Sequence, residues 1–138
     1  MKKLFIRGII RTASLALLIY ISSCEKKSAH ETGFLEGVIS IGPICPVEKN
    51  PPDPGCLPTA ETYQAYPVGI WSANGSRKTE QIAPALDGSY RAELAPGNYR
   101  VILEKEQYGI GGSNLPVDIS IFAGNTTLLN ISIDTGIR

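Results

Sequence analysis

Few side chains in this sequence could carry out catalysis, and their spacing does not assemble a complete catalytic set. Nucleophilic hydrolysis needs a histidine that a carboxylate orients beside the nucleophile. The chain has one histidine, His30, and it lies in a polar stretch that is typical of a flexible tether. The glycine-rich segment 109–114 lacks the Lys-Ser/Thr of a phosphate-binding loop. We therefore predict no catalytic residue, no enzyme activity and no cofactor.

Asp134-Thr135-Gly136 is the strongest catalytic candidate, because it follows the apolar run 128–133 and aspartic proteases place a catalytic aspartate in such a turn. Those enzymes need two carboxylates that share a proton and further chain to build a cleft. Two residues follow Gly136 in this sequence. We predict a structural role, in which Asp134 ends the last strand and pairs with a donor such as Arg138. The alternative is that this terminal segment docks on a partner.

The N-terminus has the composition of an export signal. Four basic residues among the first eleven precede the apolar run 13–21, which is too short to span a bilayer. The run ends in Ile21-Ser22-Ser23-Cys24, which resembles the lipobox of bacterial lipoproteins, where the cysteine receives a diacylglyceryl group. The resemblance implies a signal peptide over 1–23, lipid on Cys24 and a tether over 24–33. The alternative is an ordinary signal peptide with a coincidental cysteine.

Lipid on Cys24 would attach the protein to a membrane, since burial of acyl chains contributes about 0.8 kcal/mol per CH₂. We therefore expect the bacterial cell envelope as its location. Glu25 is not the aspartate that signals inner-membrane retention in some Gram-negative bacteria, so the outer membrane is favoured over the inner one.

Cys45 and Cys56 remain once Cys24 is assigned to lipid, and the segment between them contains four prolines, so it cannot be a regular strand. An even number of cysteines in an exported chain favours a disulfide. Closing a loop of this length stabilises the fold by about 3 kcal/mol in the chain-entropy model. A zinc site is the rival reading, but the distant His30 does not complete a ligand set, and we predict no metal.

Charge argues against one class of partner. Removing the four basic residues of the signal peptide from the total of 13 leaves nine against 13 acidic residues, a net charge of −4. A nucleic-acid binder would show a basic patch with interleaved aromatic residues. We predict no nucleic-acid partner.

From Phe34 onward, short runs of β-branched and aromatic residues alternate with Gly, Pro, Asn and Asp clusters, which is typical of an all-β fold. We predict a seven-stranded, Greek-key-type β-sandwich over 34–138. The segments 89–94 and 99–104 alternate apolar and polar residues about a Pro-Gly turn and are predicted to form a hairpin. The seven expected strands are 34–41, 67–72, 78–83, 89–94, 99–104, 117–121 and 128–133.

Several short motifs resemble the carboxypeptidase regulatory-like domains, which have a transthyretin-like (prealbumin-like) sandwich. The resemblance covers about residues 34–133, while the usual Gly-Tyr is here Tyr108-Gly109. The terminal segment 133–138 resembles a subgroup of small bacterial proteins of this type that end in Asp-Thr-Gly-Ile-Arg. Such domains act mostly as accessory, stabilising or binding modules. The motifs are Gly37-Val38, Pro67-Val68, Asp87-Gly88-Ser89-Tyr90 and Leu94-Ala95-Pro96-Gly97-Asn98-Tyr99.

The function that this sequence favours is a non-enzymatic, lipid-anchored interaction or accessory module of the cell envelope with an envelope protein as partner. The alternative is a lipoprotein that binds a glycan or a peptide. Its candidate ligand regions are the loops near Tyr63, Tyr66 and 109–114. Trp71 could join these tyrosines in a sugar-stacking platform, although a core tryptophan is the more common case.

Overall fold

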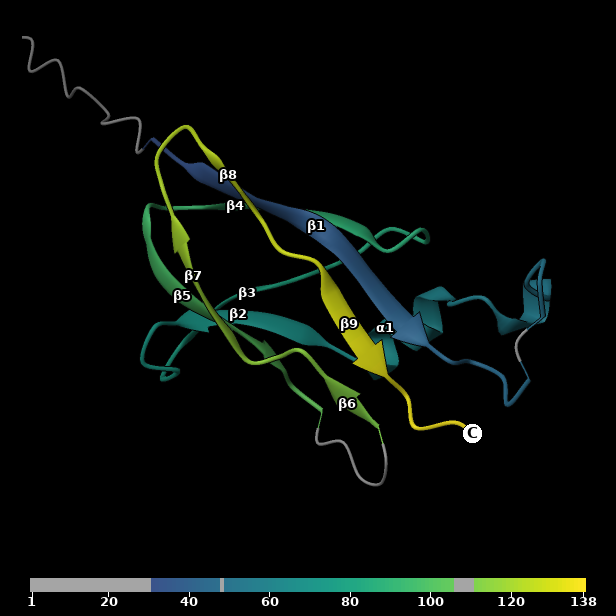
Figure 1. Cartoon of the computed structure of the whole chain (residues 1–138). Coiled ribbons are helices and arrows are strands. Elements are labelled where there is room, and N and C mark those ends of the chain that lie inside the picture. Colours follow the sequence, from purple (N-terminus) through teal and green to yellow (C-terminus); the bar gives the residue numbers. More distant parts are fainter. Residues whose placement is uncertain (1–30, 48, 106–110) are drawn as a thin grey trace, which may run out of the picture.

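The computed structural model describes residues 31–47, 49–105 and 111–138, which form two β-sheets packed face to face (Figure 1). The first sheet contains β1 (Gly33–Gly42), β4 (Ser89–Leu94), β6 (Gly112–Ser113), β8 (Thr126–Leu128) and β9 (Ile131–Asp134). The second contains β2 (Val68–Ser72), β3 (Lys78–Gln81), β5 (Gly97–Leu103) and β7 (Val117–Ile121). A 3-10 turn η1 (Pro54–Cys56) and a short helix α1 (Ala60–Ala65) lie between β1 and β2.

The all-β sandwich that the sequence predicts is confirmed. In the first sheet, β1 pairs antiparallel with β4 on one side and parallel with β8 and β9 on the other. The second sheet is antiparallel throughout, in the order β3-β2-β5-β7. After the β2–β3 hairpin in the second sheet, the chain returns as β4 beside β1, which is the Greek-key relation.

The described residues contain nine strands where seven were expected, because one predicted strand is split and one lies in a predicted loop. β8 and β9 keep a single parallel register along β1 but are interrupted at Asn130, whose side-chain oxygen accepts from the Val38 amide at 3.1 Å. A β-carbon on Gly37 would lie 1.9 Å from the Leu129 carbonyl oxygen, so only glycine allows this close approach. β6 falls in the segment predicted as a glycine-rich loop and pairs with β9.

The predicted hairpin between 89–94 and 99–104 is wrong. β4 pairs with β1, whereas β5 pairs with β2 and β7 in the other sheet. Residues 95–96 therefore carry the chain across the core. β4 buries alternate residues, as the alternation predicts, and β5 buries Val101 with Tyr99 and Leu103 partly buried against the core. A hairpin and a sheet-to-sheet crossing would both bury such faces. Alternation alone cannot choose between the two arrangements.

The core lies between the sheets and receives side chains from both. The described residues bury no charged or polar side chain in it, so its stability comes from apolar contact. β1 and β9 supply Leu35, Ile131 and Ile133 from the first sheet, and β2 and β5 supply Val68, Ile70 and Val101 from the second. These six are the largest fully buried side chains.

The segment between β1 and β2 was predicted to be a loop closed by a disulfide, and the structure adds a helix to it. In Figure 1 the segment projects beyond the end of β1 and returns through α1 to β2. The helix has six residues, too few for an amphipathic period to be visible in the sequence.

Candidate functional site

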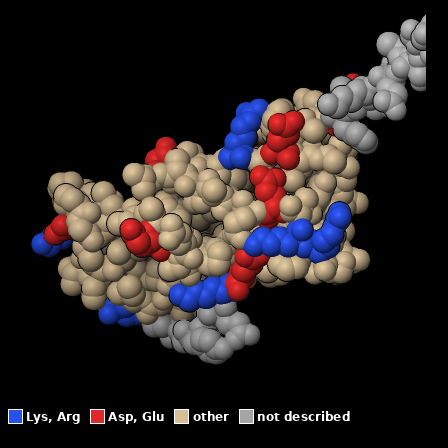
Figure 2. All heavy atoms as spheres, turned by 180° about the vertical axis from the view of Figure 1, so that it is seen from behind, with Lys and Arg blue, Asp and Glu red and all other residues tan. Residues whose placement is uncertain are grey.

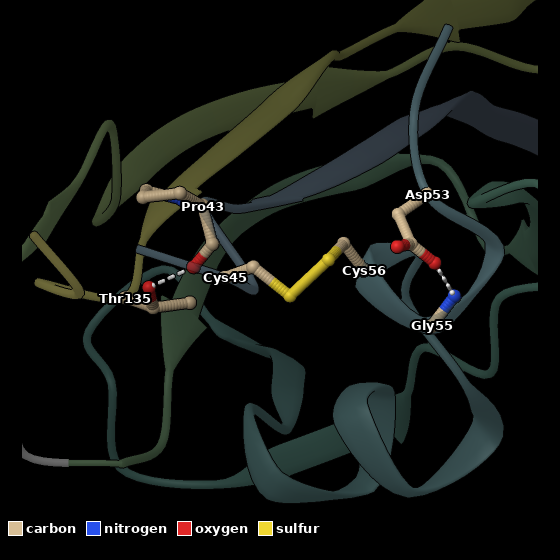
Figure 3. Close-up of a disulfide and its surroundings, with 6 residues drawn as sticks. All are labelled: Pro43, Cys45, Asp53, Gly55, Cys56 and Thr135. Carbon is tan, nitrogen blue, oxygen red and sulfur yellow. Dashed lines mark hydrogen bonds between the residues drawn. A yellow bond between two sulfur atoms is a disulfide. The ribbon is translucent and has the colours of Figure 1, made fainter. Parts of the chain in front are cut away.

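The end of the sandwich where β1 and β9 finish is held by a disulfide. Cys45 and Cys56 are bonded, with 5.4 Å between their α-carbons (Figure 3). Asp53 accepts from the Gly55 amide at 3.0 Å and begins η1, where Pro54 occupies the first helical turn. On the other side of the disulfide, the Thr135 hydroxyl donates to the Pro43 carbonyl oxygen (Figure 3). Covalent and local polar contacts thus fix a segment that its prolines keep out of the sheet.

α1 forms because its N-terminus has a capping box, in which two threonines accept from each other's backbone amides. Thr59 is the N-cap: its hydroxyl accepts from the Thr62 amide at 3.3 Å, and the Thr62 hydroxyl accepts from the Thr59 amide at 3.0 Å. The helix stops before Pro67, since the residue that precedes a proline is disfavoured in the α conformation. Tyr63 is the one buried residue of the helix and joins it to the core.

The last third of β1 lacks a strand partner on the side of β4. The β1–β4 register ends at Val38 and Ser89, and the Ile39 amide then donates to the Gly88 carbonyl at 2.8 Å. The Gly88 amide donates instead to Ala85, in a turn that takes the chain away from β1. A β-carbon on Gly88 would lie 2.3 Å from the Ile39 carbonyl oxygen, so this turn needs glycine, as its φ of +82° also requires.

The backbone amide and carbonyl of one strand residue point to one neighbouring strand, and those of the next residue point to the strand on the opposite side. Because the Ile39 amide faces the β4 side, the amide and the carbonyl of Ile41 face that side as well. Among the described residues, no backbone hydrogen bond reaches the Ile41 amide. The Ile41 amide and carbonyl are called the open edge of β1 below.

A groove of about 860 Å³ runs along this open edge, within the size range of ligand sites. One wall is β1 at residues 38–41, and the other is residues 57–61 together with Tyr63 and the turn at 86–87. Three large apolar side chains lining the groove are exposed: Val38, Leu57 and Leu86. They are half of the six exposed large apolar residues of the described part, so apolar surface is concentrated there.

The charged side chains that line the groove in the described part of the chain are two carboxylates, Glu61 and Asp87. The Ser89 hydroxyl and then the Ser89 amide donate to Asp87 and lower its pKa. A backbone hydrogen bond at Glu61 itself, and then the Thr59 hydroxyl, lower the pKa of Glu61. Both groups are therefore ionised at neutral pH, and the groove is acidic as well as apolar.

Tyr63 lies at the junction of this groove with a smaller one of about 490 Å³ on the other side of Leu86. Its side chain is 9% exposed, and its hydroxyl would lie 3.1 Å from a β-carbon on Gly88, beside the open edge. Desolvation, and then the charge of Asp87, raise the pKa of Tyr63. No hydrogen bond reaches this hydroxyl from the described residues, so it is available to a ligand.

Asp134, the residue weighed as a catalytic aspartate, is part of a terminal ion pair. Arg138 donates to both of its carboxylate oxygens, at 3.1 and 2.7 Å, and the Gly136 amide donates at 2.8 Å. The Arg138 contact, and then that from Gly136, lower the pKa of Asp134 to about 2. Asp134 ends β9 and pairs with Arg138, as the sequence predicts.

The three aromatic residues considered as a sugar platform do not come together. Tyr63 belongs to the core, whereas Trp71 lies on the outer face of β2, where its ring nitrogen donates to Glu104 at 3.1 Å. Tyr66 packs against the core with Lys105 over its ring. The interpretation of Trp71 as a core residue is wrong, because Val68 and Ile70 occupy the inner face of β2. The platform with Tyr63 does not form, because Tyr63 lies in the core.

The structure tests the remaining sequence predictions only in part, because several of the residues concerned lie outside the described ranges. The signal peptide, Cys24, His30 and most of the tether lie outside them, as do residues 109–110 of the glycine-rich segment. Within residues 31–47, 49–105 and 111–138, no cluster of His, Cys, Asp or Glu is suited to hold a metal ion. The same residues include no helix long and apolar enough to cross a bilayer.

Sequence reasoning did not find the groove. Leu57 and Leu86 stand in loops, and a single exposed leucine is ordinary. The cap sequence Thr59-Ala60-Glu61-Thr62 before Pro67 was a usable signal for the helix. The open edge has no sequence signal, because it depends on where β4 begins opposite β1.

Fold and site together define an all-β sandwich protein with an apolar, acidic groove at the end of the sandwich that holds the Cys45–Cys56 disulfide. No protein-family model matches the chain, and no curated protein matches it. Solved structures resemble it at low identity, and each alignment spans less than half of the other chain. They are the minor pilin GBS52 of Streptococcus agalactiae (15% identity, 75% of this chain, 44% of that chain, TM-score 0.49), a DUF3823 family protein from Parabacteroides merdae (15%, 74%, 45%, 0.43) and the major pilin subunit BcpA of Bacillus cereus (13%, 75%, 28%, 0.40).

Proposed function

We propose that the protein is a non-enzymatic, lipid-anchored module of the bacterial cell envelope that binds a partner through the groove. One observation carries the proposal: β1 begins at Gly33, next to the predicted tether, and its residues 38–41 line the groove, five to eight residues further along the strand. At ~3.3 Å per residue this distance is about 17–26 Å. A lipid on Cys24 would hold the first end of the sandwich near the membrane and leave the groove accessible.

The charge distribution supports a protein or peptide partner over a nucleic acid. On the face seen in Figure 2, basic and acidic side chains are interspersed, with no extended patch of either sign. Basic side chains are paired with acidic ones on the second sheet, as in Arg100–Asp118 and Lys78–Glu104. A net charge of −4 after residue 23 also disfavours binding to the phosphates of a nucleic acid.

The test is purification of the tagged full chain from detergent-solubilised membranes, with mass spectrometry of the N-terminal peptide and of co-purifying proteins. We expect a diacylated Cys24 and a stoichiometric partner. Cys24→Ala should release the protein from the membrane fraction, whereas Cys45→Ala/Cys56→Ala should leave it there. An unmodified Cys24 would refute the anchor, and an anchored protein that copurifies with no partner would favour the second function below.

That second function is direct ligand binding by the isolated lipoprotein, and the size of the groove favours it. A peptide is a better candidate than a glycan, because Trp71 and Tyr63 do not form a stacking platform. Binding of a purified ligand by the protein alone would separate this function from assembly with a larger envelope partner.

A further inference from the structure

We propose that the groove binds an extended peptide segment with alternating apolar and basic side chains, which adds a strand to the open edge of β1. The inference deepens the proposed function, because it names the chemistry of the partner at the same site. It stands on three features: unpaired strand backbone, apolar lining with acidic charge, and an available tyrosine hydroxyl.

The backbone groups of the open edge select an extended peptide. A strand that joins a sheet edge exchanges main-chain hydrogen bonds with it, and alternate side chains enter the flanking pockets. Ile41 presents its amide and its carbonyl oxygen on the side where β4 has ended, just beyond the Ile39–Gly88 contact. The turn at 85–88 leads the chain away from β1, so the position beside Ile41 has no strand. A peptide in the groove would pair with β1 at that position.

The side chains around the open edge set the composition of the peptide. Leu57 and Leu86 offer apolar surface on the wall opposite β1. Glu61 and Asp87 are ionised, and the described residues that line the groove include no basic side chain. A peptide with lysine or arginine next to apolar residues complements both, whereas an acidic peptide would be repelled.

The Tyr63 hydroxyl supplies one fixed polar contact. Its side chain is more than nine-tenths buried, and it belongs to both α1 and the core, so its position is preorganised. Lying beside Gly88 and the Ile39 carbonyl, the hydroxyl is placed to bond a main-chain group of the added strand. Preorganised groups bind with a smaller loss of conformational entropy.

The test uses the full lipidated chain in detergent micelles, with a synthetic hexapeptide of alternating valine and lysine as probe. Hydrogen exchange of single amides is measured by NMR with and without peptide. We expect exchange of the Ile41 amide to slow by about tenfold or more, because it gains an acceptor. The Ile39 amide, already bonded to Gly88, is the control in the same strand and should change little.

Two further peptides separate strand addition from simple apolar binding. Methylation of alternate backbone nitrogens, on the edge-facing side, should weaken binding about tenfold, since each lost main-chain bond contributes about 1 kcal/mol. Replacement of lysine by glutamate should abolish measurable binding. Equal affinity of the methylated and unmethylated peptides would overturn strand addition, and equal affinity of the two charge forms would overturn the acidic selectivity.

A pair of matched variants tests the location. Leu86→Ser lies in the groove and Leu128→Ser on β8 outside it, and the two leucines are 70% and 77% exposed. We expect peptide affinity to fall about tenfold in the first variant and to remain unchanged in the second. Equal effects would overturn the assignment to the groove, as would exchange protection of Ile41 by a second copy of the chain without peptide.

The outcomes for the inference and for the proposed function are distinguishable. Lipidated Cys24 and a copurifying partner, together with an Ile41 amide that no peptide protects, would retain the envelope module and refute peptide addition. Peptide protection of Ile41 in a chain with unmodified Cys24 would retain the groove and refute the anchor.

Discussion

The two ends of the sandwich are held together differently. At the tether end, where β1 begins, main-chain bonds continue the sheet: the Phe34 amide donates to Asn125 and the Gly124 amide donates to Thr32. The cystine end comprises residues 41–66, 84–88 and 134–138. Here β1 no longer pairs with β4, and a disulfide, a capping box and an ion pair hold the chain in place of the sheet hydrogen bonds. Where the ladder stops, local bonds fix the chain and leave backbone and apolar groups accessible for binding.

The first prediction concerns the tether end and has the largest expected effect. Leu35→Ala removes a fully buried side chain from the part of β1 that has partners on both sides. We expect the free energy of unfolding to fall by about 4 kcal/mol, within the 2–5 kcal/mol typical of such sites. Urea denaturation measures it. Since this region belongs to the common core, the loss should be global; a change confined to residues 33–36 would contradict the comparison.

Removal of the disulfide addresses the other end. Cys45→Ala/Cys56→Ala should lower the free energy of unfolding by about 3 kcal/mol, because a loop that holds four prolines loses its closure. Hydrogen exchange should rise first in η1 and α1 and remain slow in β1 at residues 34–38. Equal exchange at both ends would show that the disulfide supports the whole sandwich and that the ends do not differ.

Loss of the helix cap should have a smaller effect. Thr59→Ala removes the side-chain acceptor for the Thr62 amide and should cost about 1 kcal/mol. The matched control is Thr126→Ala on β8, an exposed threonine at the tether end. Urea unfolding and exchange in α1 should change in the first variant only. A comparable loss in the control would indicate that both ends depend equally on single polar contacts.

The smallest expected effect is a pH dependence at the cystine end. The Arg138 contact lowers the pKa of Asp134 from 3.8 to about 2 in the folded state. Its contribution is therefore present above about pH 4 and is lost as the pH falls toward 2. Carboxyl NMR titration measures the pKa directly, and Arg138→Gln should return it toward 3.8. An unchanged pKa in that variant would exclude the ion pair as the cause.

The acidic groove and the terminal ion pair differ in what the sequence could reveal. Asp134 and Arg138 are four residues apart after an apolar run, and their pairing follows from proximity. Glu61 and Asp87 are far apart in the chain, and they share a groove because α1 and the turn at 85–88 flank the same edge of β1. The sequence shows the charge of Glu61 and Asp87, but it does not show that the two carboxylates line the same groove.

Period-two alternation determined the all-β class and the inward faces of strands such as β4, because burial of one face depends only on residue order. Cysteine number and proline content likewise pointed to the Cys45–Cys56 bridge. Tertiary structure alone decided which strands pair. β4 and β5 look like a hairpin yet lie in different sheets, since strand partners are chosen by contacts distant in the chain. The open edge of β1 follows from that choice, because it exists only where β4 has ended beside it.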